Sequence, residues 1–184
     1  MEKKLEQTKS ELTRIVLFGP ESTGKSTLAA ALADHYNTKW VPEYARDYLQ
    51  KKYDDVAEIC APSDLIPIAK GQIQLENAKA SVANQYLFCD TCVLQTLTYA
   101  QVYYENFRSA VLEHCVKEHK YAHFFLTYID TPWVPDDLRD KPNERLKMFS
   151  IFEDILIQRQ LPYTILKGNP KQRLQKATSI IKTL

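Results

Sequence analysis

One short motif constrains this chain more than any other feature. Residues 19–26 read Gly-Pro-Glu-Ser-Thr-Gly-Lys-Ser and fit the pattern G-x-x-x-x-G-K-[S/T]. The largely apolar run 14–18 precedes the motif directly, and the Ala- and Leu-rich stretch 27–33 follows it. The alternative is an ordinary glycine turn between a strand and a helix. A strand, this motif and a helix in that order predict a phosphate-binding loop.

The motif also predicts how a nucleotide would be held. Gly19 and Gly24 allow a tight turn, so that the amides from about Ser22 to Thr27 point at a phosphate at the start of the helix. Lys25 would reach the β- and γ-phosphates, and the Ser26 hydroxyl would ligate Mg²⁺. We therefore predict ATP and Mg²⁺ as cofactors. The predicted nucleotide-binding residues are Gly19, Glu21, Ser22, Thr23, Gly24, Lys25, Ser26 and Thr27.

Length and charge restrict the class of protein. The 184 residues suffice for one well-buried domain, which we place at 13–184 after a polar N-terminal extension, 1–12. Because 24 Lys and Arg residues face 23 Asp and Glu residues, the net charge is +1, and we expect no nucleic-acid or membrane partner. Signal-peptide character is missing from residues 1–13, and no run of ~18 apolar residues occurs. We expect a soluble, cytoplasmic protein that acts on a small molecule.

Cysteine and histidine residues raise the question of metal or redox chemistry. The C-x-x-C pair Cys89 and Cys92 lacks a second ligand pair and a thioredoxin-like context, so buried free thiols are expected. His114, His119 and His123 fall within ten residues. A spacing of five places the first two on different faces of a helix, which favours a solvated helix end over a metal site.

Short apolar runs alternate with helical patterns along the chain. Strands are predicted at 14–18, 38–41, 86–90, 123–129 and 162–167. Helices are predicted at 24–36, from Ser63 to about 84, over 93–119, at 146–160 and at 171–184, and 43–49 opens a helix or an ordered loop. Ser63 is expected to cap its helix, which carries Pro67 in the first turn. The alternation predicts an α/β fold, a parallel sheet covered by helices on both faces.

Functional groups in such a sheet gather at the carboxyl ends of the strands. Asp90 ends an apolar strand, as a Walker-B-type acid does, where it would hold Mg²⁺ directly or through water; the alternative is a helix-capping aspartate. Residues 43–47 occupy a second strand end. Arg139 and Arg145 follow the fourth strand and would bring positive charge over the γ-phosphate, the alternative being a solvated surface.

In this order and spacing, the residues resemble the ribosylnicotinamide kinase domain of NadR-type NAD-biosynthesis proteins and related small P-loop ATPases. The resemblance covers residues 13–184 and rests on the segments 19–27, 43–48, 89–91 and 131–139. It implies a P-loop kinase with a five-stranded parallel sheet, a lid around 136–147, and ATP-dependent phosphorylation of nicotinamide riboside to its mononucleotide. DNA regulation and adenylyl transfer are not expected, because the chain has no H-x-G-H-type motif and no room for a helix-turn-helix.

The resemblance also assigns roles. The catalytic residues would be Lys25, Asp90, Glu43, Arg139 and Arg145, with Ser26 and Asp90 at the metal. The acceptor would be bound by Glu43, Tyr44, Arg46, Asp47 and Trp133, since aromatic faces and carboxylates suit a cationic pyridinium ring; Trp40, Tyr48, Tyr99 and Tyr103 are further aromatic candidates. The rival hypotheses are another nucleoside or nucleotide kinase and a non-catalytic ATP-binding or ATPase module. A regulatory GTPase would need N-K-x-D, which this sequence lacks.

Overall fold

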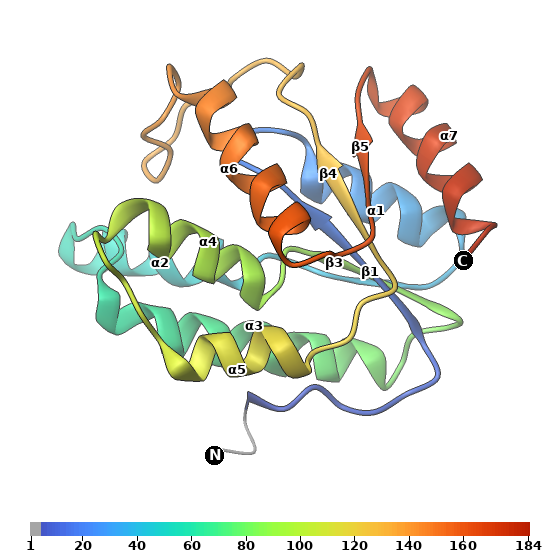
Figure 1. The fold of residues 1–184 in the computed structure, drawn as a ribbon, viewed down its shortest axis with the longest axis horizontal. Helices are drawn as coiled ribbons and strands as arrows, with labels where there is room; N and C mark the ends of the chain where they lie inside the picture. The colour runs from blue at the N-terminus through green and yellow to red at the C-terminus, as the bar shows by residue number, and fades with distance from the viewer. Residues whose placement is uncertain (1–4) are drawn as a thin grey trace.

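The continuous apolar run of β1 (Thr13–Phe18) suits its place as the central strand of the sheet. In the computed structural model, which describes residues 5–184, β1 pairs on one side with β3 and on the other with β4 (Figure 1). The other strands are β2 (Lys39–Val41), β3 (Tyr86–Asp90), β4 (His123–Thr127) and β5 (Tyr163–Leu166). Their order is β2-β3-β1-β4-β5, and all pairs are parallel. The predicted five-stranded parallel sheet is confirmed.

Helices cover both faces of this sheet (Figure 1). Their bounds are α1 (Lys25–His35), α2 (Tyr44–Val56), α3 (Leu65–Ala80), α4 (Val93–Tyr103), α5 (Ala110–Glu118), α6 (Arg145–Gln158) and α7 (Pro170–Ile181). Ile15 and Leu17 of β1 pack with α1 and α7 on one face, whereas Val16 and Phe18 pack with α4 and α6 on the other. Because β1 is buried on both faces, its end is held rigidly at the base of the site.

The region 93–119 forms two helices, so the prediction of one continuous helical pattern is wrong. Asn106 adopts a left-handed conformation with φ 56° between them. The Ser109 hydroxyl then accepts a 3.3 Å hydrogen bond from the Leu112 amide and caps α5. Neither residue interrupts the apolar periodicity, which is why the break is hidden in the sequence.

The segment between β2 and α3 also differs from expectation. The helix opening at residue 44 continues to Val56 and ends where Ala57 takes a φ of 55°. Ser63 lies inside a 3₁₀ turn, Pro62–Asp64, and does not cap α3 as predicted. Instead Asp64 accepts hydrogen bonds from the Ala61 amide and the Lys52 ammonium, both at 2.8 Å. The Tyr48 hydroxyl also donates to it at 3.1 Å, so three donors hold the Asp64 carboxylate in this turn.

Part of the predicted polar extension lies on the folded domain. Leu5 is buried in a cluster formed by α3, α4 and α5, and the Gln7 amide donates to Glu76 at 2.7 Å. His119 is buried and its Nε2–H donates a 2.9 Å hydrogen bond to the Leu5 carbonyl, so the predicted solvated helix end is wrong there. Burial lowers the pKa of His119.

The cysteines are free thiols. Cys89, Cys92 and Cys115 are buried, and Cys60 is half-buried. Burial raises the pKa of the Cys92 thiol to about 12, so it is protonated and unreactive at neutral pH. No helix within residues 5–184 is both long and apolar enough to cross a bilayer.

Candidate nucleotide and acceptor site

A cavity of about 700 Å³ opens at the carboxyl ends of the strands. The chain leaves β1 toward β3 and β2 on one side and later returns to β4 and β5 on the other, so β1 ends at the topological switch point where open α/β sheets bind ligands. The phosphate-binding loop, residues 19–26, forms one end of the cavity. The remaining walls come from α2, α3, α4 and the segment 131–140.

The phosphate-binding loop has the backbone that its glycines predict. Gly19 has φ 135°, and a Cβ atom there would lie 3.0 Å from the Thr127 hydroxyl oxygen. Gly24 caps α1 with φ 81°, a left-handed conformation that suits glycine. The Lys25 ammonium is buried and donates to the Pro20 carbonyl at 2.8 Å. The loop is therefore folded around its own lysine at the start of a helix, where backbone amides and the helix dipole favour an anion.

Asp90 lies at the bottom of the cavity and is 1% exposed. Neither carboxylate oxygen has a hydrogen-bond partner within residues 5–184. Burial, and then the nearby Glu43 carboxylate, raise the pKa of Asp90 to about 6, while Lys25 and the Ser26 hydroxyl act in the opposite direction. Two buried oxygens without partners need an explanation, and a divalent cation shared with the Ser26 hydroxyl supplies one.

Glu43 lies at the end of β2 with its carboxylate in the cavity. Gln95 of α4 donates to it at 3.4 Å. Gln72 of α3 fixes the same corner, because its side chain accepts from the Tyr44 amide at 2.8 Å and donates to the Pro42 carbonyl at 3.3 Å. Two glutamines from neighbouring helices thus hold the start of α2 and the carboxylate that precedes it.

One carboxylate organises the segment that follows β4. Asp136 accepts hydrogen bonds from Arg46 of α2 at 2.5 Å and from the Leu138 amide at 3.0 Å, and pairs with Arg139 at 3.0 Å. Burial alone would raise the pKa of Asp136, but Arg46, the Leu138 amide and Arg139 together lower it below the ordinary value. Two arginines that were predicted for the acceptor and the transition state therefore share one aspartate.

The segment after β4 also touches the phosphate-binding loop. The Val134 amide donates to the Ser22 hydroxyl at 3.0 Å, and the Lys141 amide donates to Glu21 at 3.3 Å. Burial raises the pKa of Glu21. The nearby Asp140 carboxylate raises it further, whereas the hydrogen bond from the Lys141 amide lowers it. Arg145, at the start of α6, donates to the Thr131 carbonyl at 2.8 Å. The segment predicted as a lid, around 136–147, thus already contacts the phosphate-binding loop over which it would close.

Most of the predicted site residues line one cavity. Those that do are Glu21, Ser22, Thr23, Gly24, Lys25, Ser26, Thr27, Glu43, Arg46, Asp47, Asp90 and Arg139, with the aromatic candidates Trp40, Tyr99 and Tyr103. Five others lie outside its lining. Gly19 starts the loop against Thr127, and Arg145 lies against the loop backbone. Tyr44 packs its ring on Gly71, Tyr48 donates to Asp64 at 3.1 Å, and Trp133 stacks with Arg145 at 5.7 Å.

Sequence reasoning missed several polar groups at the site. Gln95 is 3% exposed, and its carbonyl oxygen has no hydrogen-bond partner in the described part of the chain. A glutamine in the otherwise apolar first turn of the helix after Asp90 was the available signal. Asp137 and Asp140 also line the cavity. Both lie in the charged segment 136–145, where neither residue stands out from its neighbours in the sequence.

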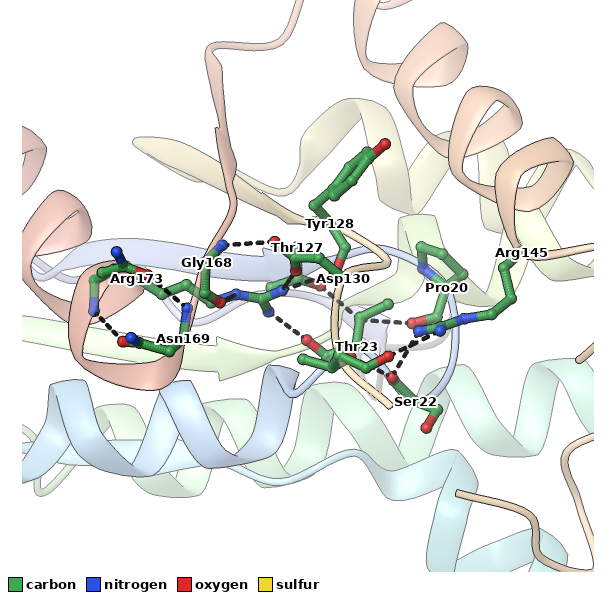
Figure 2. A network of polar contacts seen from close by, with 12 residues as sticks. Pro20, Ser22, Thr23, Thr127, Tyr128, Asp130, Arg145, Gly168, Asn169 and Arg173 are labelled. Carbon is green, nitrogen blue, oxygen red and sulfur yellow. Dashed lines mark hydrogen bonds and ion pairs between the residues drawn. The ribbon is translucent and has the colours of Figure 1, made fainter. Parts of the chain in front are cut away.

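Arg173 of α7 is a further residue that the sequence did not reveal. It is 2% exposed and lies behind the phosphate-binding loop (Figure 2). Its guanidinium donates to the carbonyls of Thr23 at 2.5 Å, Gly168 at 2.9 Å and Tyr128 at 2.9 Å, and it pairs with Asp130. Nothing in the amphipathic pattern of the last helix distinguishes this arginine from a surface residue.

The fold and the cavity together define a P-loop NTPase of the kinase-like type, with a phosphate-binding loop at the switch point and an acid at the end of β3. The chain belongs to the family described as AAA domain, whose model matches residues 14–173. It is 32% identical over 125 residues to the trifunctional NAD biosynthesis/regulator protein NadR of Salmonella typhimurium and of Escherichia coli. The match covers 68% of this chain and 30% of each relative, so the chain spans about a third of their length. The predicted NadR resemblance is confirmed.

Solved structures show the same fold. The NadR protein in complex with NR superposes with a TM-score of 0.77 at 22% identity, covering 94% of this chain and 51% of that one. NadR in complex with NAD and AMP-PNP gives 0.73 at 20% identity, with 93% and 49% covered. A deoxyadenosine kinase from M. mycoides gives 0.65 at 13% identity, with 94% and 100% covered. The architecture is therefore shared with nucleoside kinases as well as with NadR.

Proposed function

We propose that this chain is an ATP-dependent kinase that phosphorylates nicotinamide riboside to nicotinamide mononucleotide. The observation that carries the proposal is a single cavity in which the phosphate-binding loop faces a second half lined by carboxylates. A homologue named for NAD biosynthesis, a similar structure with NR and another with AMP-PNP support it.

The loop half of the cavity suits the triphosphate of ATP. Residues 22–27 present the start of α1, where amides attract phosphate oxygens. Lys25 would exchange the Pro20 carbonyl for a phosphate oxygen, a charge-assisted hydrogen bond of greater strength. Ser26 and Asp90 would hold Mg²⁺, which when bound neutralises charge on the β- and γ-phosphates.

The other half of the cavity suits a cationic nucleoside better than a phosphorylated one. Four carboxylates line it, from Glu43, Asp47, Asp137 and Asp140. Arg46 and Arg139 face the same space, but both are paired with Asp136. A second phosphate would meet excess negative charge here, whereas a pyridinium ring would be attracted by it and by the aromatic faces of Tyr99 and Tyr103.

The two halves meet at Glu43 and Asp90, whose carboxylates are close enough for Glu43 to raise the pKa of Asp90. Glu43 would accept a hydrogen bond from the acceptor hydroxyl and take its proton as the new oxygen–phosphorus bond forms and the bond to the β-phosphate oxygen breaks. Gln95 would keep that carboxylate oriented toward the hydroxyl. The protein would act mainly by positioning the acceptor hydroxyl and by neutralising the charge of the phosphates.

A panel assay tests the function directly. ADP release from ATP is measured with nicotinamide riboside, adenosine, deoxyadenosine, cytidine, thymidine, thymidine monophosphate or no acceptor, and Lys25→Ala serves as the control. We expect acceptor-dependent release with nicotinamide riboside, and a product of the mass of its mononucleotide. Preference for another acceptor would reassign the substrate, and equal release without acceptor would indicate an ATPase module.

A further inference from the structure

Three carbonyl groups of the phosphate-binding loop are each held by side chains. The Pro20 carbonyl accepts from Lys25 and from the Thr23 hydroxyl, both at 2.8 Å. The Ser22 carbonyl accepts from the Thr131 hydroxyl at 2.7 Å and from Arg145 at 3.2 Å. The Thr23 carbonyl accepts from Arg173 at 2.5 Å. Figure 2 shows Arg173 and Arg145 approaching the loop from opposite sides.

Holding a carbonyl also directs the next amide. In a trans peptide the C=O and the following N–H point in opposite directions within one plane, and all peptide bonds within residues 5–184 are trans. With its carbonyl held by Arg173, the Thr23–Gly24 peptide turns the Gly24 N–H away from α7. Gly24 lines the cavity in which a phosphate would bind.

Arg173 is itself fixed on the side away from the loop. Its guanidinium donates to the Gly168 and Tyr128 carbonyls and pairs with Asp130. Burial alone would raise the pKa of Asp130, but the Gly168 amide and Arg173 lower it, so the pair is ionised at neutral pH. The guanidinium therefore ties the end of β4 and the β5–α7 turn to the loop.

We propose that Arg173 is a positioning residue for phosphate binding: it orients the Thr23–Gly24 peptide so that the Gly24 amide is preorganised as a phosphate donor. The proposal rests on the proposed function for its ligand, a nucleoside triphosphate. The residue acts through the backbone, and its planar fork is required. A lysine at 173 keeps the charge, but its three donors share one nitrogen. They cannot reproduce the fork in which Nε, Nη1 and Nη2 reach the Gly168, Thr23 and Tyr128 carbonyls separately.

A second buried arginine provides a matched control. Arg14 is 5% exposed, pairs with the fully buried Glu76 at 3.1 Å, and donates to the Thr8 carbonyl at 2.7 Å. It lies at the opposite end of β1 from the phosphate-binding loop. Arg173→Lys and Arg14→Lys thus make the same chemical change at two similarly buried arginines, and only one of the two residues contacts the loop.

Calorimetric titration with MgATP, beside thermal unfolding, separates positioning from stability. We expect Arg173→Lys to raise the Kd for MgATP at least tenfold, with an unfolding midpoint close to that of Arg14→Lys. Arg14→Lys should bind MgATP within about twofold of the parent. Similar affinity in the two variants would overturn the proposal. Absence of MgATP binding by the parent would instead reject the proposed function.

A spectrum of the Gly24 amide tests the peptide orientation without nucleotide. The chain has four glycines, and among them only Gly24 follows a threonine, so labelling with ¹³C-carbonyl threonine and ¹⁵N-glycine selects the Thr23–Gly24 peptide. We expect its resonance to shift or broaden in Arg173→Lys and to stay in place in Arg14→Lys. In the unselected ¹⁵N–¹H spectrum of the same samples, the Gly71 resonance of α3 should be unchanged in both. An unmoved Gly24 resonance in Arg173→Lys would refute the proposal even if the parent binds no ATP.

Discussion

Replacing Asp90 by asparagine should stabilise the fold at neutral pH while it impairs the site. Asp90 is buried, its oxygens have no hydrogen-bond partner in the described chain, and its pKa is raised to about 6 from an ordinary 3.8. A carboxyl whose pKa is higher in the folded state holds its proton there at pH values where the unfolded chain has lost it. The protonated carboxyl therefore makes its full contribution to the free energy of unfolding below about pH 3.8, and this contribution is lost as the pH rises through about 6.

The magnitude follows from that difference in pKa. At about 1.4 kcal/mol for each pKa unit, ionised Asp90 costs the folded state about 3 kcal/mol above pH 6. Asparagine removes the charge with little change of shape. For a domain of this size we expect an unfolding midpoint raised by about 6–12 °C at pH 7.5, and a difference that vanishes near pH 4.

Thermal and urea unfolding of both proteins from pH 4 to pH 8, without nucleotide or Mg²⁺, measures this difference. Asp64→Asn is the control of opposite sign. Burial alone would raise the pKa of Asp64, but Lys52, the Ala61 amide and Tyr48 lower it, so its ionised form stabilises the fold and the variant should be less stable at pH 7.5. An Asp90→Asn protein no more stable than the parent at pH 7.5 would refute the account of this carboxylate.

Four further predictions concern catalysis. Lys25→Ala should lower turnover by more than 10²-fold with a nearly unchanged unfolding midpoint, because the lysine neutralises phosphate charge; near-normal turnover would contradict its role. Glu43→Gln should reduce transfer strongly at unchanged ATP affinity, and equal loss of ATP binding would place Glu43 on the nucleotide side. Arg139→Ala should lower kcat by about 10²-fold, or about 2.7 kcal/mol, with little change in the KM for ATP. Arg145→Ala should lower kcat similarly and also raise the KM for ATP, since Arg145 holds the Ser22 carbonyl; turnover within a few-fold of the parent in both variants would contradict the lid role.

The fold was largely predictable because its signals are local. Each strand is a short apolar run, and the loop glycines have the positive φ angles that the motif requires. The break between α4 and α5 was not predictable, because it depends on Asn106 in a left-handed conformation and on the Ser109 cap. The Asp64 turn was missed for a related reason, since its partner Lys52 lies on another helix.

The candidate site was predictable where residues adjoin a strand end, as Lys25, Glu43 and Asp90 do. Partners that come from distant helices were not. Arg173 has ordinary sequence surroundings, and Gln95 is marked only by the apolar residues of its helical turn. The packing of α7 brings Arg173 to the loop, and that of α4 brings Gln95 to Glu43. The positions of Arg46 and Arg139 were also anticipated, but their shared contact with Asp136 was not.

The contacts that hold the phosphate-binding loop also determine when the loop can fold during translation. The Thr23 hydroxyl bonds that of Thr127, 104 residues later, and the Thr23 carbonyl bonds Arg173, 150 residues later. The ribosome therefore exposes the loop well before its supports, which are complete only when α7 has emerged. Such non-local closure slows folding. Nucleotide affinity should thus be among the last properties that this domain acquires, and ATP added to translating ribosomes would stabilise chains in which α7 has emerged rather than shorter intermediates.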